Sequence, residues 1–223
     1  FGLGNGLVGP RRQSPALARL MCGIAGLATS TPADLNAIFR MTEALAHRGP
    51  DGAGHLFAFG RSAILASSPT HESANLALGH RRLAIIDCSS AGAQPMAAAD
   101  RSCWIIYNGE VYNYLELRAE LAAQGWVFRS ASDTEVIIAA YRTWGTECFQ
   151  RFNGMWALAL WDVHSNRLVL SRVRLGVKPL YLSFAQGRLA FASEIKALLA
   201  SGLIEARLNP RPAIAFLKWS VVH

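Results

Sequence analysis

The sequence predicts an α+β fold in which two packed sheets lie between helical layers. Apolar segments of strand length recur along the chain, and segments with apolar residues at helical spacing separate them. Residues 155–192 form the longest strand-rich run, divided by turn sequences at 164–166 and 186–187. Many strands with few helices bury their apolar faces best when sheets pack together and helices cover the outside.

The first half of the chain begins with residues 23–28, an apolar segment with two glycines that predicts a buried strand. Residues 30–32 (Ser-Thr-Pro) are typical of a helix start. Apolar positions at helical spacing follow them: Leu35, Ile38, Met41 and Leu45. The loop at 47–52 ends this helix. Short strands are expected near 55–59, 62–66, 76–86 and 103–107.

The second half predicts a helix from Tyr114 to Gln124, ended by Gly125, and another from Asp133 to Trp144, ended by Gly145. Ser193 to Leu199 is expected to form a closing helix with Ser193 as its cap. The strands expected between these helices cover residues 155–162, 167–171, 179–184 and 188–192.

The composition fits one well-packed domain, with 223 residues of which 52% are hydrophobic and 17% charged. The net charge is +7, but no run of five Lys or Arg occurs, so we expect no nucleic-acid partner. No apolar run reaches the ~18 residues of a membrane span, so no membrane partner is expected either. The four cysteines show no Cys-x-x-Cys spacing, which disfavours a metal site or a disulfide framework and fits a reducing cytoplasm.

Both ends of the chain read as additions to this domain. Residues 1–21 look like an upstream extension that the mature protein lacks, and a short cleaved propeptide is the alternative. Glycines, prolines and arginines leave no apolar core for a signal peptide there. Residues 206–223 read as the start of a linker, because the chain stops inside an apolar segment.

The most informative stretch is Met21-Cys22-Gly23, because removal of Met21 would leave Cys22 as the first residue. An N-terminal cysteine carries its own base: its α-amine has a pKa of about 7.7–8.0 and its thiol about 8.5. Two alternatives are a small buried hydrophobe and a lipoprotein signal. Leu20 and Met21 before the cysteine do not fit the second alternative.

Asn108-Gly109-Glu110 follows the apolar strand segment 104–107, where side chains can meet a pocket. An asparagine NH2 and a glycine N–H can donate two hydrogen bonds to an oxyanion, and the missing Cβ lets the substrate come close. An ordinary Asn-Gly turn is the alternative reading of this tripeptide.

Two charged residues could grip a free α-amino acid. Arg82 stands between apolar neighbours and can hold a carboxylate with two parallel bonds; otherwise it is a solvated strand-edge residue. Asp133 begins a predicted helix and could bind an ammonium, or could simply cap the helix.

The chain resembles the glutaminase domain of glutamine-dependent asparagine synthetases over residues 21–205, through eight motifs that follow one another in the order found in that family. The motifs that carry the resemblance are Met21–Ile24, His47–Asp51, Gly79–Leu83, Gln94–Met96, Tyr107–Asn113, Ser132–Val136, Gly154–Ala157 and Lys178–Tyr181. That domain is a class II glutamine amidotransferase with the four-layer αββα N-terminal-nucleophile hydrolase fold, in which both sheets are antiparallel.

The resemblance implies a role for each matching residue. Cys22 is the nucleophile, Asn108 and Gly109 form the oxyanion hole, and Arg48 with the 49–52 loop frames the pocket. The residues expected to bind glutamine are Arg82, Leu83, Ala84, Ile85, Ile86, Asn108, Gly109, Glu110 and Asp133. No metal and no cofactor are expected for this half.

The same resemblance implies a second domain, which uses ATP and Mg²⁺ to convert aspartate to asparagine with the ammonia that glutamine releases. Its Ser-Gly-Gly-x-Asp-Ser loop does not occur before His223, so residues 22–205 are expected to be the glutaminase half only. Expected partners are L-glutamine and that synthetase domain, as part of the same chain, and a homodimer stays open. Val173 departs from the family, which has Asp there; we expect the change to affect local order or coupling to the second domain.

The function expected from these residues is hydrolysis of L-glutamine to glutamate and ammonia for cytoplasmic asparagine biosynthesis. Two alternatives remain: an amidotransferase domain that serves a different acceptor, and a non-catalytic scaffold domain with the same fold. The presence of Cys22 with Asn108 and Gly109 favours the enzyme.

Overall fold

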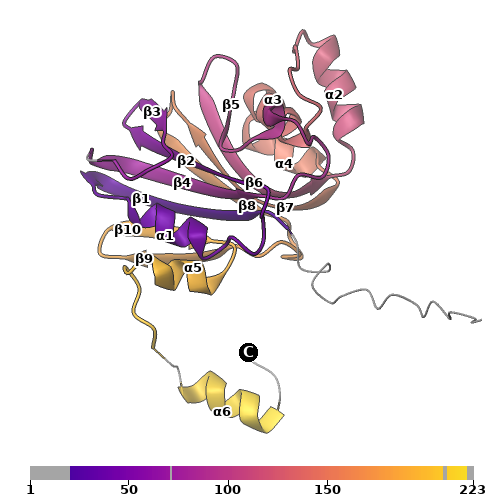
Figure 1. Ribbon diagram of the computed structural model, residues 1–223. Helices are drawn as coiled ribbons and strands as arrows, with labels where there is room; N and C mark the ends of the chain where they lie inside the picture. Colours follow the sequence, from indigo (N-terminus) through magenta and orange to yellow (C-terminus); the bar gives the residue numbers. More distant parts are fainter. Residues whose placement is uncertain (1–20, 71, 208–209, 220–223) are drawn as a thin grey trace, which may run out of the picture.

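Two antiparallel sheets pack face to face and helices cover both outer sides in the computed structural model, which describes residues 21–70, 72–207 and 210–219 (Figure 1). One sheet has the strand order β3-β2-β4-β1-β10-β9, and the other has the order β5-β6-β7-β8. This arrangement confirms the α+β fold of two sheets between helical layers.

The six-stranded sheet is built around β1. On one side Gly23 pairs with Arg81 of β4, and on the other Ala25 pairs with Ala192 of β10. Its strands are β1 (Gly23–Ala33), β2 (Gly52–Phe59), β3 (Ser62–Leu65), β4 (Ala74–Arg82), β9 (Tyr181–Ala185) and β10 (Arg188–Ala192). With neighbours on both edges, β1 is held along most of its length from its first residue.

The four-stranded sheet centres on the long β6–β7 pair, which runs in register from Cys103 opposite Asp162 to Val111 opposite Gly154. Its strands are β5 (Met96–Ala97), β6 (Cys103–Val111), β7 (Gly154–Asp162) and β8 (Arg167–Arg172). Residues 108–110 therefore belong to β6 and are fixed by the ladder with β7.

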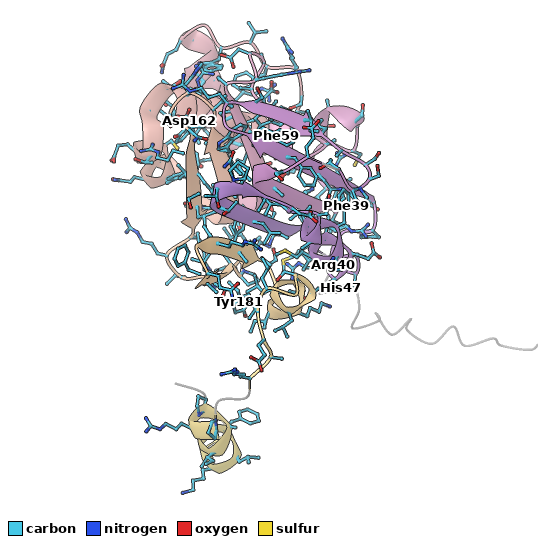
Figure 2. All side chains as sticks on the ribbon, turned by 90° about the vertical axis from the view of Figure 1, so that its left-hand side faces the viewer. Phe39, Arg40, His47, Phe59, Asp162 and Tyr181 are labelled. Carbon is cyan, nitrogen blue, oxygen red and sulfur yellow. The ribbon has the colours of Figure 1, made fainter. Side chains whose placement is uncertain are left out.

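The helices form the two outer layers. Those against the six-stranded sheet are α1 (Ala37–Glu43) and α5 (Ile195–Ala200), and those against the four-stranded sheet are α2 (Tyr114–Ala123), α3 (Asp133–Trp144) and α4 (Cys148–Arg151). The side view shows Phe39 and Arg40 of α1 and Asp162 of β7 on opposite sides of the packed sheets (Figure 2). Two 3₁₀ turns, Ser90–Gly92 and Gly145–Glu147, and a further helix, α6 (Pro210–Trp219), complete the elements.

The core has three layers, one on each side of the two sheets and one between them. The layer between the sheets joins Ile24 and Phe191 of the first sheet to Ile106 of the second, and all three are 0% exposed. The helix-side layers are filled by the apolar faces of α1 with α5 and of α3 with α2. All four apolar positions predicted at helical spacing are buried: Leu35, Ile38, Met41 and Leu45.

Three local predictions were wrong. Residues 30–32 do not start a helix: Ala33 still pairs with Ala74, so β1 continues through them, and α1 begins at Ala37. The strand predicted to 86 ends at Arg82, because the next backbone donors go to side chains rather than to a neighbouring strand. Ser193 is no helix cap: its hydroxyl accepts the N–H of Ile24, which ties α5 to β1.

The short elements β5 and α4 were not predicted, and neither was α6 within the expected linker. Residues 1–20 lie outside the described residues. In the part of the chain that the structure describes, we find no helix of the length and apolarity that crossing a bilayer requires.

We expect Ile106→Ala to lower the free energy of unfolding by about 2–5 kcal/mol, because it leaves a cavity between the sheets. Urea denaturation of both proteins measures this. Val127→Ala, at a position that is 82% exposed, is the matched control and should change stability by less than about 0.5 kcal/mol. A similar small change for Ile106→Ala would contradict the packing described.

Candidate active site

A single pocket forms where several elements begin or end. Cys22 directly precedes β1, Arg82 ends β4, residues 108–110 lie near the end of β6, and Asp133 is the first residue of α3. The pocket brings together all ten residues predicted to bind or attack the substrate. These are Cys22, Arg82, Leu83, Ala84, Ile85, Ile86, Asn108, Gly109, Glu110 and Asp133.

The Cys22 thiol is held by the backbone just beyond β4. The N–H of Leu83 lies 3.3 Å from Cys22 Sγ, and Sγ lies 3.5 Å from the carbonyl oxygen of Leu83. Burial raises the pKa of the Cys22 thiol, while the Leu83 N–H and the guanidinium groups of Arg82 and Arg48 oppose that rise. A thiol in this position needs a nearby base to ionise at neutral pH.

Arg48 lies behind Cys22 rather than along the pocket wall. Its Nε donates to the carbonyl oxygen of Cys22 at 3.0 Å, and its Nη1 donates to Glu194 at 2.9 Å. Arg48 and the 49–52 loop are not among the residues that line the pocket, and the expectation that they frame it stays a prediction. Asp51 acts from outside by accepting the N–H of Ala84, so this loop supports the pocket indirectly.

Asn108 and Gly109 form the wall nearest to β7. The Asn108 side chain is 1% exposed, and its Nδ2 has no hydrogen-bond partner among the described residues. A buried amide donor without a partner costs about 1–3 kcal/mol, so its presence calls for a functional reason. At Gly109 a Cβ would lie 2.2 Å from the Met155 carbonyl oxygen, so no other residue fits this backbone.

Asp133 does not cap its helix. The cap is Ser132, whose hydroxyl accepts the N–H of Thr134 at 3.1 Å. Asp133 Oδ2 instead accepts from Tyr107 Oη at 2.9 Å and from Val111 N at 3.0 Å, which joins α3 to β6. Burial raises the pKa of the Asp133 carboxyl, and these two hydrogen bonds oppose the rise.

Arg82 is partly used by the loop that follows it. Its Nη2 donates to the carbonyl oxygens of Asp87 and Ser89, which leaves the other guanidinium nitrogens for a ligand in the pocket. The reading of Arg82 as a purely solvated edge residue is therefore wrong. Glu110 is half-buried on the wall of the same pocket and brings a second carboxylate to it.

Several lining residues were not predicted as site residues. Gln94 accepts from Tyr107 N at 2.6 Å and donates to Thr134 at 3.3 Å, which joins β6 to α3. Lys178 is 6% exposed and reaches the pocket from the segment between β8 and β9. Both lie in quoted motifs, Gln94–Met96 and Lys178–Tyr181, so the sequence marked these positions without indicating their contacts.

Val173, the departure from the family pattern, fits the local structure. Its N–H donates to the Trp156 carbonyl oxygen at 3.0 Å, and its side chain packs against the core between the four-stranded sheet and its helices. Local order is therefore kept at this position. Among the described residues, no group of three or more His, Cys, Asp or Glu side chains is arranged to bind a metal ion.

Comparison with known proteins gives a family model and named relatives. The family model described as a glutamine amidotransferase domain matches residues 21–223. A glutamine-hydrolysing asparagine synthetase of Bacillus subtilis is 37% identical over 186 residues, which cover 81% of this chain and 27% of that protein. An amidase of Penicillium rubens, chyE, is 38% identical over 157 residues, which cover 70% of this chain and 21% of that protein.

Among solved structures, the glutamine phosphoribosylpyrophosphate amidotransferase of Bacillus subtilis superimposes with a TM-score of 0.72 at 20% identity. The match covers 83% of this chain and 45% of that one. This likeness confirms the predicted four-layer αββα fold, in which two antiparallel sheets lie between helical layers. The chain spans about a quarter of the length of the first curated relatives it matches.

The raised pKa of Asp133 predicts how its replacement changes stability with pH. The folded chain holds this proton to higher pH than the unfolded chain, so ionised Asp133 lowers stability above its folded pKa and has no such effect below about pH 3.9. We expect Asp133→Asn to gain stability relative to wild type as pH rises from about 3.5 to 7, measured by urea denaturation.

Asp100→Asn serves as a control of opposite sign, because hydrogen bonds from Ser102 lower the pKa of Asp100. That variant should lose stability relative to wild type over the same pH range. If Asp133→Asn followed the same trend as Asp100→Asn, burial would not dominate the titration of Asp133.

Proposed function

This chain belongs to the glutamine amidotransferase family, and we propose that it hydrolyses L-glutamine to glutamate and ammonia with Cys22 as the nucleophile. The observation that carries this proposal is one pocket that holds both the Cys22 thiol and the unpartnered Asn108 amide. A nucleophile and an unused hydrogen-bond donor at the same cavity are what hydrolysis of an amide requires.

The chemistry starts from a chain whose first residue is Cys22. Its α-amine takes the thiol proton, and the thiolate attacks the side-chain amide carbon of glutamine. Negative charge develops on the amide oxygen, to which Asn108 Nδ2 and the Gly109 N–H donate. The protonated amine then gives its proton to the departing nitrogen, ammonia leaves, and a thioester remains.

Water completes the reaction. The same amine, now neutral, removes a proton from the water that attacks the thioester carbon. The second tetrahedral oxyanion is stabilised by the same two donors, and its collapse releases glutamate and restores the thiol.

The charged residues of the pocket suit the two ends of a free amino acid. We place the α-carboxylate of glutamine against Arg82, and its ammonium between Asp133 and Glu110. The backbone of Leu83, Ala84, Ile85 and Ile86 would run along the substrate, since these residues line the pocket as a loop without a strand neighbour. The substrate would then be selected by both charges as well as by its amide.

The wider role extends beyond the described residues. We propose that residues 22–205 form the glutaminase domain and that the ammonia feeds asparagine synthesis in the cytoplasm. That step would use ATP and Mg²⁺ on a synthetase domain of the same chain, and no step above depends on them. The named relatives include both asparagine synthetases and an amidase, so a different acceptor remains the main alternative, ahead of a non-catalytic scaffold.

The N-terminal mechanism predicts that ammonia release depends on where the chain starts. A chain expressed from Met21, with Cys22 first after processing, should release ammonia from glutamine, and a chain that starts at Phe1 should not, because acylation removes the base. Cys22→Ala should abolish release, and Cys88→Ala, at an exposed thiol outside the pocket, should retain it. Wild-type release from Cys22→Ala would sink this assignment.

We expect Asn108→Ala to lower kcat for glutamine hydrolysis by about 10²–10³ with a smaller effect on KM, because the amide acts on the oxyanion of the transition state. Steady-state ammonia release measures both constants. Asn75→Ala, whose side chain accepts the N–H of Gly60 outside the pocket, is the matched control. An Asn108→Ala variant with wild-type kcat would remove Asn108 from the oxyanion site.

A further inference from the structure

Lys178 is a buried cation beside the nucleophile that the mechanism above leaves unused. It is 6% exposed and lines the pocket with Cys22. None of the ion pairs among the described residues includes it. Among the described residues, the hydrogen-bond partner of its Nζ is the sulfur of Met21, at 2.7 Å. A buried ammonium whose hydrogen-bond partner is a weak acceptor is costly for the fold, so a structural role alone explains it poorly.

The position of Lys178 is fixed by the backbone around it. Arg172 Nε donates to the carbonyl oxygen of Lys178 at 2.8 Å, and Arg172 Nη2 donates to that of Gly176 at 2.6 Å. Gly176 itself takes a positive φ of 65°, which turns the chain toward the pocket. The lysine is therefore aimed at this site by a structured turn rather than by a free loop.

Met21 places Lys178 close to the α-amine of Cys22. The sulfur of Met21 is separated from Cys22 N by five covalent bonds, roughly 6 Å at full extension, so Nζ lies within about 9 Å of that nitrogen. Removal of Met21, on which the proposed function rests, takes away this hydrogen bond of Nζ and leaves the Lys178 charge in the pocket with Cys22. Burial and the guanidinium of Arg48 lower the pKa of Lys178, while negative charge on Cys22 and Glu110 opposes that effect.

The other charges around Cys22 have partners once glutamine is bound. Arg48 pairs with Glu194 at 2.9 Å, Arg82 would hold the substrate carboxylate, and Glu110 and Asp133 would hold its ammonium. Asp87, also at the pocket, accepts from Ser89 and from the N–H of Ala131. Arg81, next along β4, pairs with Glu43 on the side of α1. Among the cations named here, Lys178 is then the one that has neither an ion pair among the described residues nor a proposed substrate partner.

We propose that Lys178 is a positioning residue whose positive charge keeps the α-amine of Cys22 unprotonated and favours ionisation of its thiol. A nearby cation disfavours a protonated amine and favours a thiolate, so it lowers the pKa of the α-amine and the pKa of the thiol. At roughly 9 Å and an intermediate dielectric constant, one charge shifts such a group by about one pH unit. Lys178 thereby makes the self-contained base of an N-terminal cysteine effective at neutral pH.

The test is the pH dependence of Lys178→Met, which keeps the length of the side chain and removes its charge. In chains that begin at Cys22, verified by intact mass, the acidic limb of kcat/KM for glutamine hydrolysis should move up by about one pH unit. The rate at pH 6.5 should fall up to about tenfold and recover at high pH. Lys178→Arg should restore the wild-type limb, and Lys218→Met on α6 should leave it unchanged.

A second readout does not require glutaminase activity. The rate of Cys22 alkylation by iodoacetamide, followed by mass spectrometry of the N-terminal peptide, reports ionisation of the thiol directly. The pH at which the alkylation rate is half its maximum should rise in Lys178→Met and return to the wild-type value in Lys178→Arg. Thermal unfolding verifies that both variants fold. If Lys178→Met shows this shift relative to wild type but the wild-type chain releases no ammonia, the proposed function is overturned and the inference stands.

Two results would overturn the inference itself. One is a Lys178→Met variant whose alkylation midpoint and acidic limb both coincide with those of wild type. The other is a Lys178→Arg variant that fails as fully as Lys178→Met at all pH values, because an arginine supplies charge but cannot accept a proton. That second result would make Lys178 a proton acceptor instead.

Discussion

The structure depends on the pairing of β1, which starts one residue after Cys22. A chain terminus normally frays, because its first residues have few partners. Here Gly23 pairs with Arg81 and the N–H of Ile24 bonds to the Ser193 hydroxyl, so the start of β1 is fixed on both sides. Arg48 then bonds the carbonyl oxygen of Cys22 itself. In the proposed mechanism Cys22 is both the nucleophile and the first residue, and this residue would gain the rigidity of a central strand.

Packing of the two sheets brings the remaining groups to this terminus. The layer that contains Ile24 and Ile106 joins β1 to β6, and β6 carries Asn108 and Gly109 near its end. On the other face of β6, Tyr107 bonds Asp133 at the start of α3. The pocket is therefore lined by residues from both sheets and from the helical layer of α3, but not by residues of α1 or α5. Its geometry depends on the same contacts that stabilise the fold.

The sequence predicted most of the fold, because its apolar periodicity reflects burial on one face of each long element. The sequence-based predictions failed where a contact with a residue far away in the sequence overrides the preference of a short segment. Residues 30–32 have the composition of a helix start, yet β1 runs through them and pairs with β4 again at Ala33. Ser193 has the residue type of a cap, yet its hydroxyl serves Ile24, which lies far away in the sequence.

At the site, motifs identified the residues that meet in the pocket, but periodicity and spacing could not show which side chains contact one another. Asp133 illustrates this: its position at a helix start fits a cap, and only the fold shows that Ser132 has that role. Lys178 and Met21 are also distant in sequence, so their contact follows from the tertiary structure alone.

The unpartnered amide of Asn108 has a consequence for anyone who redesigns this chain. Design for thermal stability removes buried polar groups that lack partners, because each one favours the unfolded state. By that criterion Asn108 is among the first residues to be replaced by an apolar one. The most stable version of this fold would then keep its shape and its thiol and lose the donor on which amide hydrolysis is proposed to depend, a trade-off between durability and reactivity located in one side chain.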